Sequence, residues 1–355
     1  MNVSRIVEVH ADDPLGALRE FLASWWRADR LDALLAPVEL PNGSGVRMQV
    51  IEDPSGLEAV NPYAPLMESN AATAIGKFSR DRPDGRLAAI LRPCELRALT
   101  ELRKRRHPPA AVDTVTIVGV DCLGTFNVED YSECVRVHGQ KRVTRQLLDH
   151  ASEGDCSLRR LRAACRVCEW PAPRGADLTI GGIGVAPDDY LLVIAPDEAT
   201  DERLGLAAVA PDLAEESQVV RREVAVGAVA KKRAKARAEL MEALPLRFND
   251  VGSLLAWLSR CTLCGDCLDA CPLYDGELSG LLGGERPHAG GNALLAELVD
   301  VSRWLASCAG CGMCEQACTC DVPLTLVIAA LSGRIRHELN YRSGDPAQRL
   351  PWTAA

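Results

Sequence analysis

Two cysteine runs near the end of the chain share one spacing. The first is Cys261, Cys264, Cys267 and Cys271, and the second is Cys308, Cys311, Cys314 and Cys318, so both read C-x-x-C-x-x-C-x-x-x-C. This spacing suits [4Fe–4S] clusters, because three thiolates in one loop cap three irons and the fourth cysteine usually binds the other cluster. Paired C-x-x-C units also bind zinc, but a zinc site needs only four ligands and does not require this spacing twice. The runs therefore predict two [4Fe–4S] clusters and the transfer of single electrons.

The end of the second run departs from the pattern of the first. Pro272 follows the first run directly, whereas the second run continues Cys318-Thr319-Cys320, and proline arrives only at Pro323. The spacing favours Cys318 as the ligand, and Cys320 is the alternative.

Four further cysteines have the setting of a third metal site. Cys94 follows an apolar run and Pro93 at the start of an expected helix, where a nearby Arg stabilises a thiolate. Cys122 follows the next apolar run, and Cys165 and Cys168 form a C-x-x-C pair. Because strand ends gather along one edge of an α/β sheet, these four cysteines are candidate ligands of a third cluster. A zinc site and scattered buried cysteines are the alternatives.

The chain divides into an α/β part and a helical part. Asp13-Pro14 precedes apolar residues at helical spacing, which predicts a helix there. Short runs rich in Val, Ile and Leu predict strands of a helix-covered sheet at Val46–Ile51, Leu87–Leu91, Thr114–Val120, Leu178–Ile180 and Tyr190–Ile194. We expect an α/β domain at 1–200, a helical connector at 201–250, a helical domain with two clusters at 251–341 and a tail at 342–355.

The two later segments have distinct patterns. The connector carries a basic run, Lys231–Arg237, which is a solvated helix face or, alternatively, a docking patch for an acidic partner. In the C-terminal part, Asn292–Ala306 and the residues from Pro323 to His337 predict helices around the second cysteine run. This part resembles the helical ferredoxin domains of heterodisulfide reductase and succinate dehydrogenase iron–sulfur subunits.

Composition excludes several other classes of function. A net charge of −9 makes a nucleic-acid partner unexpected, because phosphate binding needs a basic surface. The polar start of the chain lacks a signal peptide, and no apolar stretch approaches the roughly 20 residues of a membrane span. Fifteen cysteines without an export signal predict a reducing compartment, hence a cytoplasmic protein with no membrane span.

The order of four short segments identifies a family resemblance. They are Arg92-Pro93-Cys94-Glu95-Leu96-Arg97-Ala98-Leu99, Asp121-Cys122-Leu123-Gly124, Cys165-Arg166-Val167-Cys168-Glu169-Trp170 and the run from Ala176 to Gly184. Over roughly residues 60–200 the chain resembles the coenzyme F-420 hydrogenase/dehydrogenase beta-subunit family, with an organisation closest to formate dehydrogenase beta subunits. The resemblance implies Cys94, Cys122, Cys165 and Cys168 as cluster ligands beside an FAD. Cys134 and Cys156 have no place in the pattern.

The flavin would take an electron pair and release single electrons to the clusters. Gly181, Gly182 and Gly184 follow a strand and would let backbone approach a phosphate or ring, although an ordinary turn has the same composition. The region where the family binds its flavin contains four further candidate contacts: Asn61, Tyr63, Asn70 and Lys77. The alternative interpretation is that they are ordinary polar loop residues. No catalytic side chain is expected, because the chemistry would occur at the flavin.

The resemblance implies an oxidoreductase subunit with several partners. These are a catalytic dehydrogenase or hydrogenase subunit, a heterodisulfide-reductase-like or other one-electron acceptor protein, and a soluble hydride carrier of deazaflavin or nicotinamide type. No Rossmann fingerprint for a nicotinamide nucleotide is present. The alternative is a flavin-free conduit that only wires two other subunits together.

Overall fold

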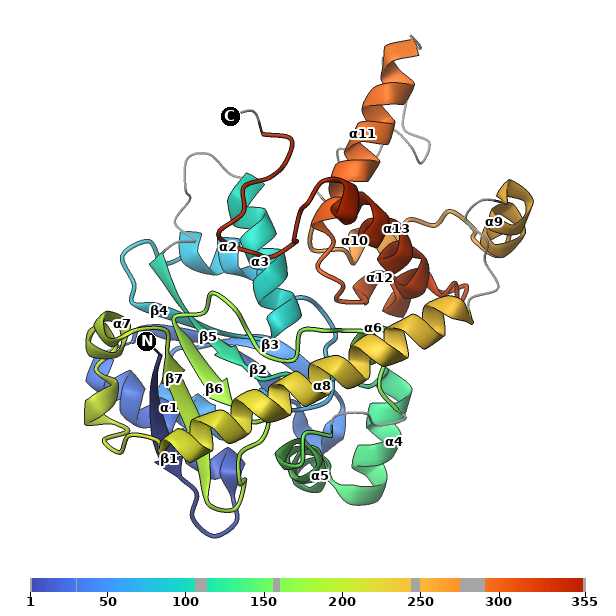
Figure 1. The fold of residues 1–355 in the computed structure, drawn as a ribbon. Helices are drawn as coiled ribbons and strands as arrows, with labels where there is room; N and C mark the ends of the chain where they lie inside the picture. Colours follow the sequence, from blue (N-terminus) through green and yellow to red (C-terminus); the bar gives the residue numbers. More distant parts are fainter. Residues whose placement is uncertain are drawn as a thin grey trace.

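A computed structural model describes residues 2–29, 31–105, 114–155, 160–243, 250–274 and 291–353. It has an α/β domain and a smaller helical region beside it, with the long helix α8 (Glu216–Glu242) running from one to the other (Figure 1). None of the helices in these ranges has the length and apolarity to cross a membrane.

A seven-stranded sheet forms the centre of the α/β domain, in the order β1-β7-β6-β5-β4-β2-β3. Its strands are β1 (Val3–Glu8), β2 (Ala33–Glu39), β3 (Val46–Ile51), β4 (Leu87–Leu91), β5 (Val115–Val120), β6 (Leu178–Gly181) and β7 (Tyr190–Ala195). Strands β2, β4, β5 and β6 are parallel, and antiparallel strands close both sides. The carboxyl ends of the four parallel strands therefore meet at one edge of the sheet.

Helices cover both faces of this sheet. They are α1 (Pro14–Asp29), α2 (Ala72–Arg80), α3 (Pro93–Arg105), α4 (Val128–His138), α5 (Gln140–Ser152), α6 (Ala163–Arg166) and α7 (Glu198–Arg203). One buried cluster joins α1, α5 and α8 to alternate strand residues such as Ile90 and Val118. The other joins α2 and α3 to the intervening residues Leu91 and Ile117. This alternation is what a sheet buried on both faces requires.

The helical region packs against α3. It contains α9 (Val251–Leu258), α10 (Asp266–Asp269), α11 (Gly291–Ser307), α12 (Met313–Gln316) and α13 (Leu324–Glu338). Leu273 and Ala309 from this region join the buried cluster of α2 and α3. Beyond α13 the chain returns to α3, where Tyr341 Oη donates a hydrogen bond to the buried carboxylate of Glu101 at 2.7 Å. The cluster-bearing loops are thus held directly against the sheet domain.

The structure confirms the mixed α/β core and the five strands that the apolar runs predicted. Helices α1, α11 and α13 also form where they were predicted, and each predicted end lies within two residues of the observed one. Strands β1 and β2 were not predicted. Arg5 lies in β1 and is buried, with its Nε donating to Asp201 Oδ1 at 2.7 Å. This ion pair, which forms only in the folded chain, compensates the charge of an arginine inside a strand. Within the predicted connector, Leu213 bridges to Arg5 of the sheet domain, and Glu216–Glu242 form helix α8.

Candidate iron–sulfur sites

The first candidate site, here the core site, consists of Cys94, Cys122, Cys165 and Cys168. Cys94 is the second residue of α3, directly after β4, and Cys122 follows β5, the neighbouring parallel strand. Cys165 lies in α6 and Cys168 just after it. The thiol of Cys122 interacts electrostatically with those of Cys94, Cys165 and Cys168, so the structure brings the four cysteines together at the carboxyl edge of the sheet.

Burial is the main influence on these thiols. It raises the pKa of Cys94 well above its usual range, with further increases from Cys122 and Cys311. Burial and the neighbouring Cys165 thiol raise the pKa of Cys122 to about 11. Several buried thiols side by side cannot ionise together without a cation between them. A metal cluster is the group that would accept these thiols as thiolates and release their protons.

Cys165 has the opposite tendency. Burial acts to raise its pKa, but the Arg162 guanidinium and hydrogen bonds from Thr125 outweigh burial and lower it. The Thr125 backbone N–H donates to Cys165 Sγ at 3.3 Å, and the Thr125 hydroxyl lies 3.2 Å from the same sulfur. Cys165 is therefore better prepared to ionise than Cys94 or Cys122.

The two C-terminal runs fold alike. In each, a loop leads through a left-handed glycine, Gly265 or Gly312, into a short helix, α10 or α12. The first cysteine of each run accepts a hydrogen bond at 3.4 Å from the backbone N–H two residues later, Leu263 to Cys261 and Gly310 to Cys308. Equal spacing has thus produced equal backbone geometry in the two loops.

The last cysteine of each run lies with the first three of the other. Burial and then the thiols of Cys261, Cys264 and Cys318 raise the pKa of Cys267. Burial and then the thiols of Cys308, Cys311 and Cys271 raise the pKa of Cys314. We call Cys308, Cys311, Cys314 and Cys271 the inner site, and Cys261, Cys264, Cys267 and Cys318 the outer site. This exchange of fourth cysteines is the arrangement expected of a two-cluster fold.

Cys320, the alternative ligand to Cys318, lies beside the outer site. Its sulfur is 3.6 Å from Thr262 Oγ1, and hydrogen bonding from Thr262 lowers its pKa. Cys318 is among the thiols that raise the pKa of Cys267. Cys318 therefore stays the expected fourth ligand of the outer site, with Cys320 as the alternative.

The thiol spacing also bears on the choice of metal. All fourteen cysteines that the structure describes are free thiols. In the same ranges no three His, Cys, Asp or Glu side chains converge on a point that one metal ion would occupy. A cubane needs no such convergence, because each thiolate binds a different iron, whereas zinc draws four ligands to about 2.3 Å from one centre. The residues present fit [4Fe–4S] clusters.

Arginines connect these sites, and most of them were not anticipated from the sequence. Arg233 of α8 donates to the backbone oxygen of Cys122 at 3.3 Å, and Arg237 donates to that of Ala329 at 3.3 Å. Arg162 contacts Thr125 Oγ1 at 2.9 Å and the backbone oxygen of Cys311 at 3.4 Å. The basic run Lys231–Arg237 is therefore divided, with Lys231, Lys232 and Lys235 exposed and Arg233 buried. The signal that was available is the spacing of Arg222, Arg233 and Arg237, which places all three on one face of a helix.

Comparisons with known proteins agree with this arrangement. Residues 84–218 match the family model for the C terminus of the coenzyme F420 hydrogenase/dehydrogenase beta subunit, and residues 257–322 match the 4Fe-4S dicluster domain. The chain carries a coenzyme F420 hydrogenase/dehydrogenase beta-subunit domain and a 4Fe-4S dicluster domain. The predicted family resemblance is thereby confirmed. The beta-subunit domain contains the whole core site, and the dicluster domain contains the inner and outer sites.

Two individual proteins extend the comparison. The F420-dependent formate dehydrogenase 1 subunit beta of Methanococcus maripaludis is 26% identical over 125 residues, which make up 30% of this chain and 32% of that protein. The chain thus matches about a third of that relative's length. A chain of the F420-reducing [NiFe] hydrogenase complex from Methanosarcina barkeri aligns with a TM-score of 0.48 and 13% identity, covering 71% of this chain and 94% of that one.

The glycine turn predicted to approach a flavin is occupied by the protein itself. The backbone N–H groups of Gly182 and Ile183 donate to Asp121 Oδ2 at 3.1 and 3.3 Å, and that of Gly184 donates to Ala151 at 2.9 Å. A Cβ at Gly182 would lie 2.8 Å from the Tyr63 ring. These glycines therefore admit Asp121 and Tyr63, and the turn does not fit a phosphate in this structure.

The remaining flavin candidates differ among themselves. Asn61 is buried and fully engaged, donating to Thr144 Oγ1 at 2.8 Å and accepting from the Tyr63 backbone at 3.1 Å. Lys77 lies exposed on α2. The Tyr63 hydroxyl and Asn70 Nδ2 are buried and have no hydrogen-bond partner within the described ranges. Among the buried atoms of the predicted set, these two are the ones left available to a bound group.

Two cysteines had no place in the predicted sites. Cys134 is half-buried on α4, where the exposed Arg160 lies 3.3 Å from its sulfur. Cys156 falls outside the described residues.

Proposed function

We propose that this protein is the iron–sulfur electron-transfer subunit of an oxidoreductase complex, of the F420-linked formate dehydrogenase or hydrogenase kind. The observation that carries the proposal is the succession of thiol sets from the sheet edge to the molecular surface. Cys94 of the core site interacts with Cys311 of the inner site, and Cys271 of the inner site belongs to the run that supplies most of the outer site. The outer site ends in Cys261 and Cys264, which are exposed.

Each site would hold one [4Fe–4S] cluster through its four cysteines. When bound, such a cluster accepts and releases one electron at a time. The chain's own contribution is to place the three sets in series, half-bury the core thiols and surround them with arginines. The family matches support this order, because the core site falls within 84–218 and the inner and outer sites fall within 257–322.

The partners follow from the two ends of the series. The half-buried core site would serve the two-electron side of the complex, and the outer site, with Cys261 and Cys264 exposed, would serve a one-electron acceptor or donor protein. The name of the M. maripaludis relative supports a formate- and F420-linked catalytic partner. We infer a catalytic dehydrogenase or hydrogenase subunit on the first side and a heterodisulfide-reductase-like or similar protein on the second.

A second candidate adds FAD to the same relay. The buried, unpaired Tyr63 hydroxyl and Asn70 Nδ2 favour it, because buried polar atoms are nearly always paired in native proteins. A flavin there would exchange an electron pair for single electrons. Asn61 and the turn at Gly181, Gly182 and Gly184 would take no direct part, since their polar groups are already bonded.

Quantifying iron, sulfide and flavin on one anaerobically purified sample tests both candidates. About twelve irons and twelve sulfides per chain are expected, the count for three cubanes. One FAD per chain would select the flavin-bearing version, and full iron without flavin would select the conduit. About eight irons would contradict the core site and with it the proposed relay.

A further inference from the structure

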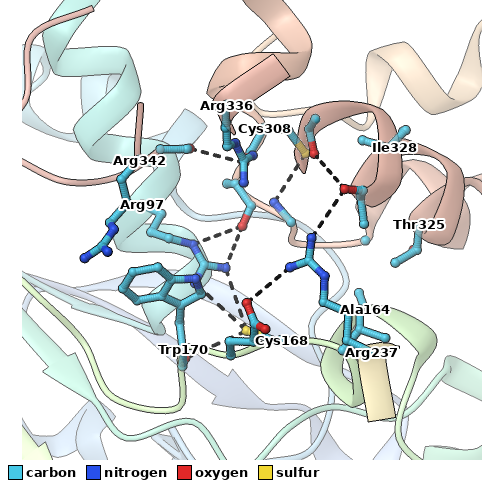
Figure 2. Close-up of a pocket in the computed structure, with 18 of the residues that line it drawn as sticks. Arg97, Ala164, Cys168, Trp170, Arg237, Cys308, Thr325, Ile328, Arg336 and Arg342 are labelled. Atoms are coloured by element: carbon cyan, nitrogen blue, oxygen red, sulfur yellow. Dashed lines mark hydrogen bonds and ion pairs between the residues drawn. The ribbon is translucent and has the colours of Figure 1, made fainter. Parts of the chain in front are cut away.

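Arg97 joins the two domains at the point where the core and inner sites meet. It lies on α3, one turn after Cys94, and its guanidinium points toward Cys168 and Trp170 (Figure 2). Nε and Nη2 donate to the backbone oxygen of Ala309, at 3.1 and 2.6 Å. Nη1 and Nη2 lie 3.9 and 3.8 Å from Cys168 Sγ. One side chain thus reaches a core-site sulfur and the loop that follows Cys308 of the inner site.

The surroundings of Arg97 hold it in this position. Its guanidinium carbon lies 5.7 Å from the centroid of the Trp170 ring. A Cβ at Gly344 would collide with the aliphatic part of the Arg97 side chain, and Gly344 has a positive φ of 76°. Gly344 is itself anchored through its N–H to the buried Glu101 carboxylate at 2.7 Å. The C-terminal segment therefore packs closely on Arg97 and leaves it little freedom.

A cavity of about 180 Å³ lies beside this contact, between the two domains. Cys168, Trp170, Cys308 and Arg336 are among the residues that line it (Figure 2). Arg336 donates to the backbone oxygen of Ala306 at 2.9 Å and also contacts that of Cys308. The gap between the core and inner sites is therefore bordered by cationic groups whose hydrogen bonds end on the cluster-bearing loops.

We propose that Arg97 is a positioning residue of the relay: it raises the reduction potential at the core site and fixes that site against the inner one. The inference rests on the proposed function, because it presumes clusters on both cysteine sets. A cation and N–H donors beside a ligand sulfur favour the added electron, and hydrogen bonds to sulfur are a recognised determinant of cluster potential. The bond to Ala309 supplies the second role, since it ties the Cys308 loop to α3.

Two substitutions separate the two roles. Arg97→Met removes the charge and all donors while retaining an unbranched side chain. Arg97→Lys keeps the charge but, with one ammonium in place of a planar fork, loses the simultaneous bonds to Ala309 and Cys168. Arg174→Met is the matched control, because Arg174 is exposed, lies 4.5 Å from the same Trp170 ring and, among the described hydrogen bonds, has none to Cys168 or Ala309.

The test is a redox titration of the anaerobically purified full chain, followed by electron paramagnetic resonance after iron has been counted. Arg97→Met should disfavour reduction of the core site by about tenfold, which is about 59 mV for a one-electron couple. The inner site should shift less and the outer site not at all. Arg97→Lys should retain most of the core potential but weaken the magnetic coupling between the core and inner signals in fully reduced protein.

Several results would overturn the proposal. One is a core potential in Arg97→Met that equals that of the wild type and of Arg174→Met at full iron content. Another is an equal shift in all three sites. If Arg97→Met does not retain iron, Arg97→Lys is the deciding variant. An unchanged magnetic coupling between its core and inner signals would refute the positioning role. A wild-type chain with only about eight irons would instead contradict the proposed function itself.

Discussion

The core site and the outer site offer the same number of thiols in opposite settings. Of the core cysteines, Cys94 and Cys122 follow neighbouring parallel strands and Cys165 packs against the large buried cluster of the sheet domain. The outer cysteines lie on loops and a single-turn helix, with Cys261 and Cys264 exposed. Around the helical region the separate buried cluster is small, with Ala306, Tyr341 and Leu350 as its fully buried members. In the first domain the fold positions the ligands, whereas in the second the clusters would replace much of a hydrophobic core.

Removing iron should affect the two domains very unequally. Chelation under anaerobic conditions should abolish most protection of backbone amides in residues 250–274 and 308–338 while leaving β4 and β5 protected, because the sheet has large apolar clusters of its own. Hydrogen exchange read by mass spectrometry measures this directly. Equal loss of protection in both domains would mean that the sheet also depends on its cluster.

Single ligand substitutions should separate the two regions in a similar way. Cys264→Ala and Cys94→Ala should each remove about four irons, one cubane. Cys264→Ala should also loosen the dicluster domain and block transfer to a protein partner, while leaving the core signal in place. Cys94→Ala should leave the dicluster signals and interrupt their link to the core. Iron analysis and electron paramagnetic resonance give both readouts, and identical spectra from the two folded variants would contradict the division into modules.

The edge of the sheet should be sensitive to loss of its buried ion pair. The Asp121 carboxylate is buried and accepts from Arg222 Nε at 3.0 Å, as well as from the N–H groups of Gly182 and Ile183. Asp121→Ala should lower the free energy of unfolding of the sheet domain by about 3–5 kcal/mol, since it strands a buried guanidinium and two donors. Denaturant titration followed by circular dichroism measures the change.

The control for this experiment is an exposed ion pair in the same domain. Asp188 contacts Arg145 with roughly half of its side chain exposed, 53%. Asp188→Ala should change stability by no more than about 1 kcal/mol. If Asp121→Ala lost no more stability than Asp188→Ala, the Asp121 network would contribute little to the sheet edge that holds the core site.

The smallest effect is expected at the cysteine beside the outer site. Cys320→Ala should retain the full iron content, whereas Cys318→Ala should lose about four irons. The reason is that Cys318 has the spacing of a fourth ligand and its thiol acts on Cys267. If Cys318→Ala retained its iron and Cys320→Ala lost it, Cys320 would be the fourth ligand of the outer site.

The same contrast explains what could be predicted from the sequence. Cysteine spacing is a local pattern, so the sequence alone predicted both C-terminal runs and their paired geometry. Apolar runs likewise predicted the strands that precede Cys94 and Cys122. Long-range compensation is not local. The burial of Arg5 in β1 depends on Asp201, and the role of Arg97 depends on Ala309 in another domain. The glycines after β6 were predicted to receive a ligand, but they admit Asp121 and Tyr63, which no spacing in the sequence reveals.

The most direct test of three cysteine sites in series is a quantitative reductive titration of the anaerobically purified chain, with integrated electron paramagnetic resonance. We predict uptake of about three electrons per chain and, at full reduction, magnetic interaction between the core and inner signals and between the inner and outer signals. Uptake of about two electrons, with no signal that disappears in Cys94→Ala, would contradict the account, because the beta-subunit domain would then hold no cluster.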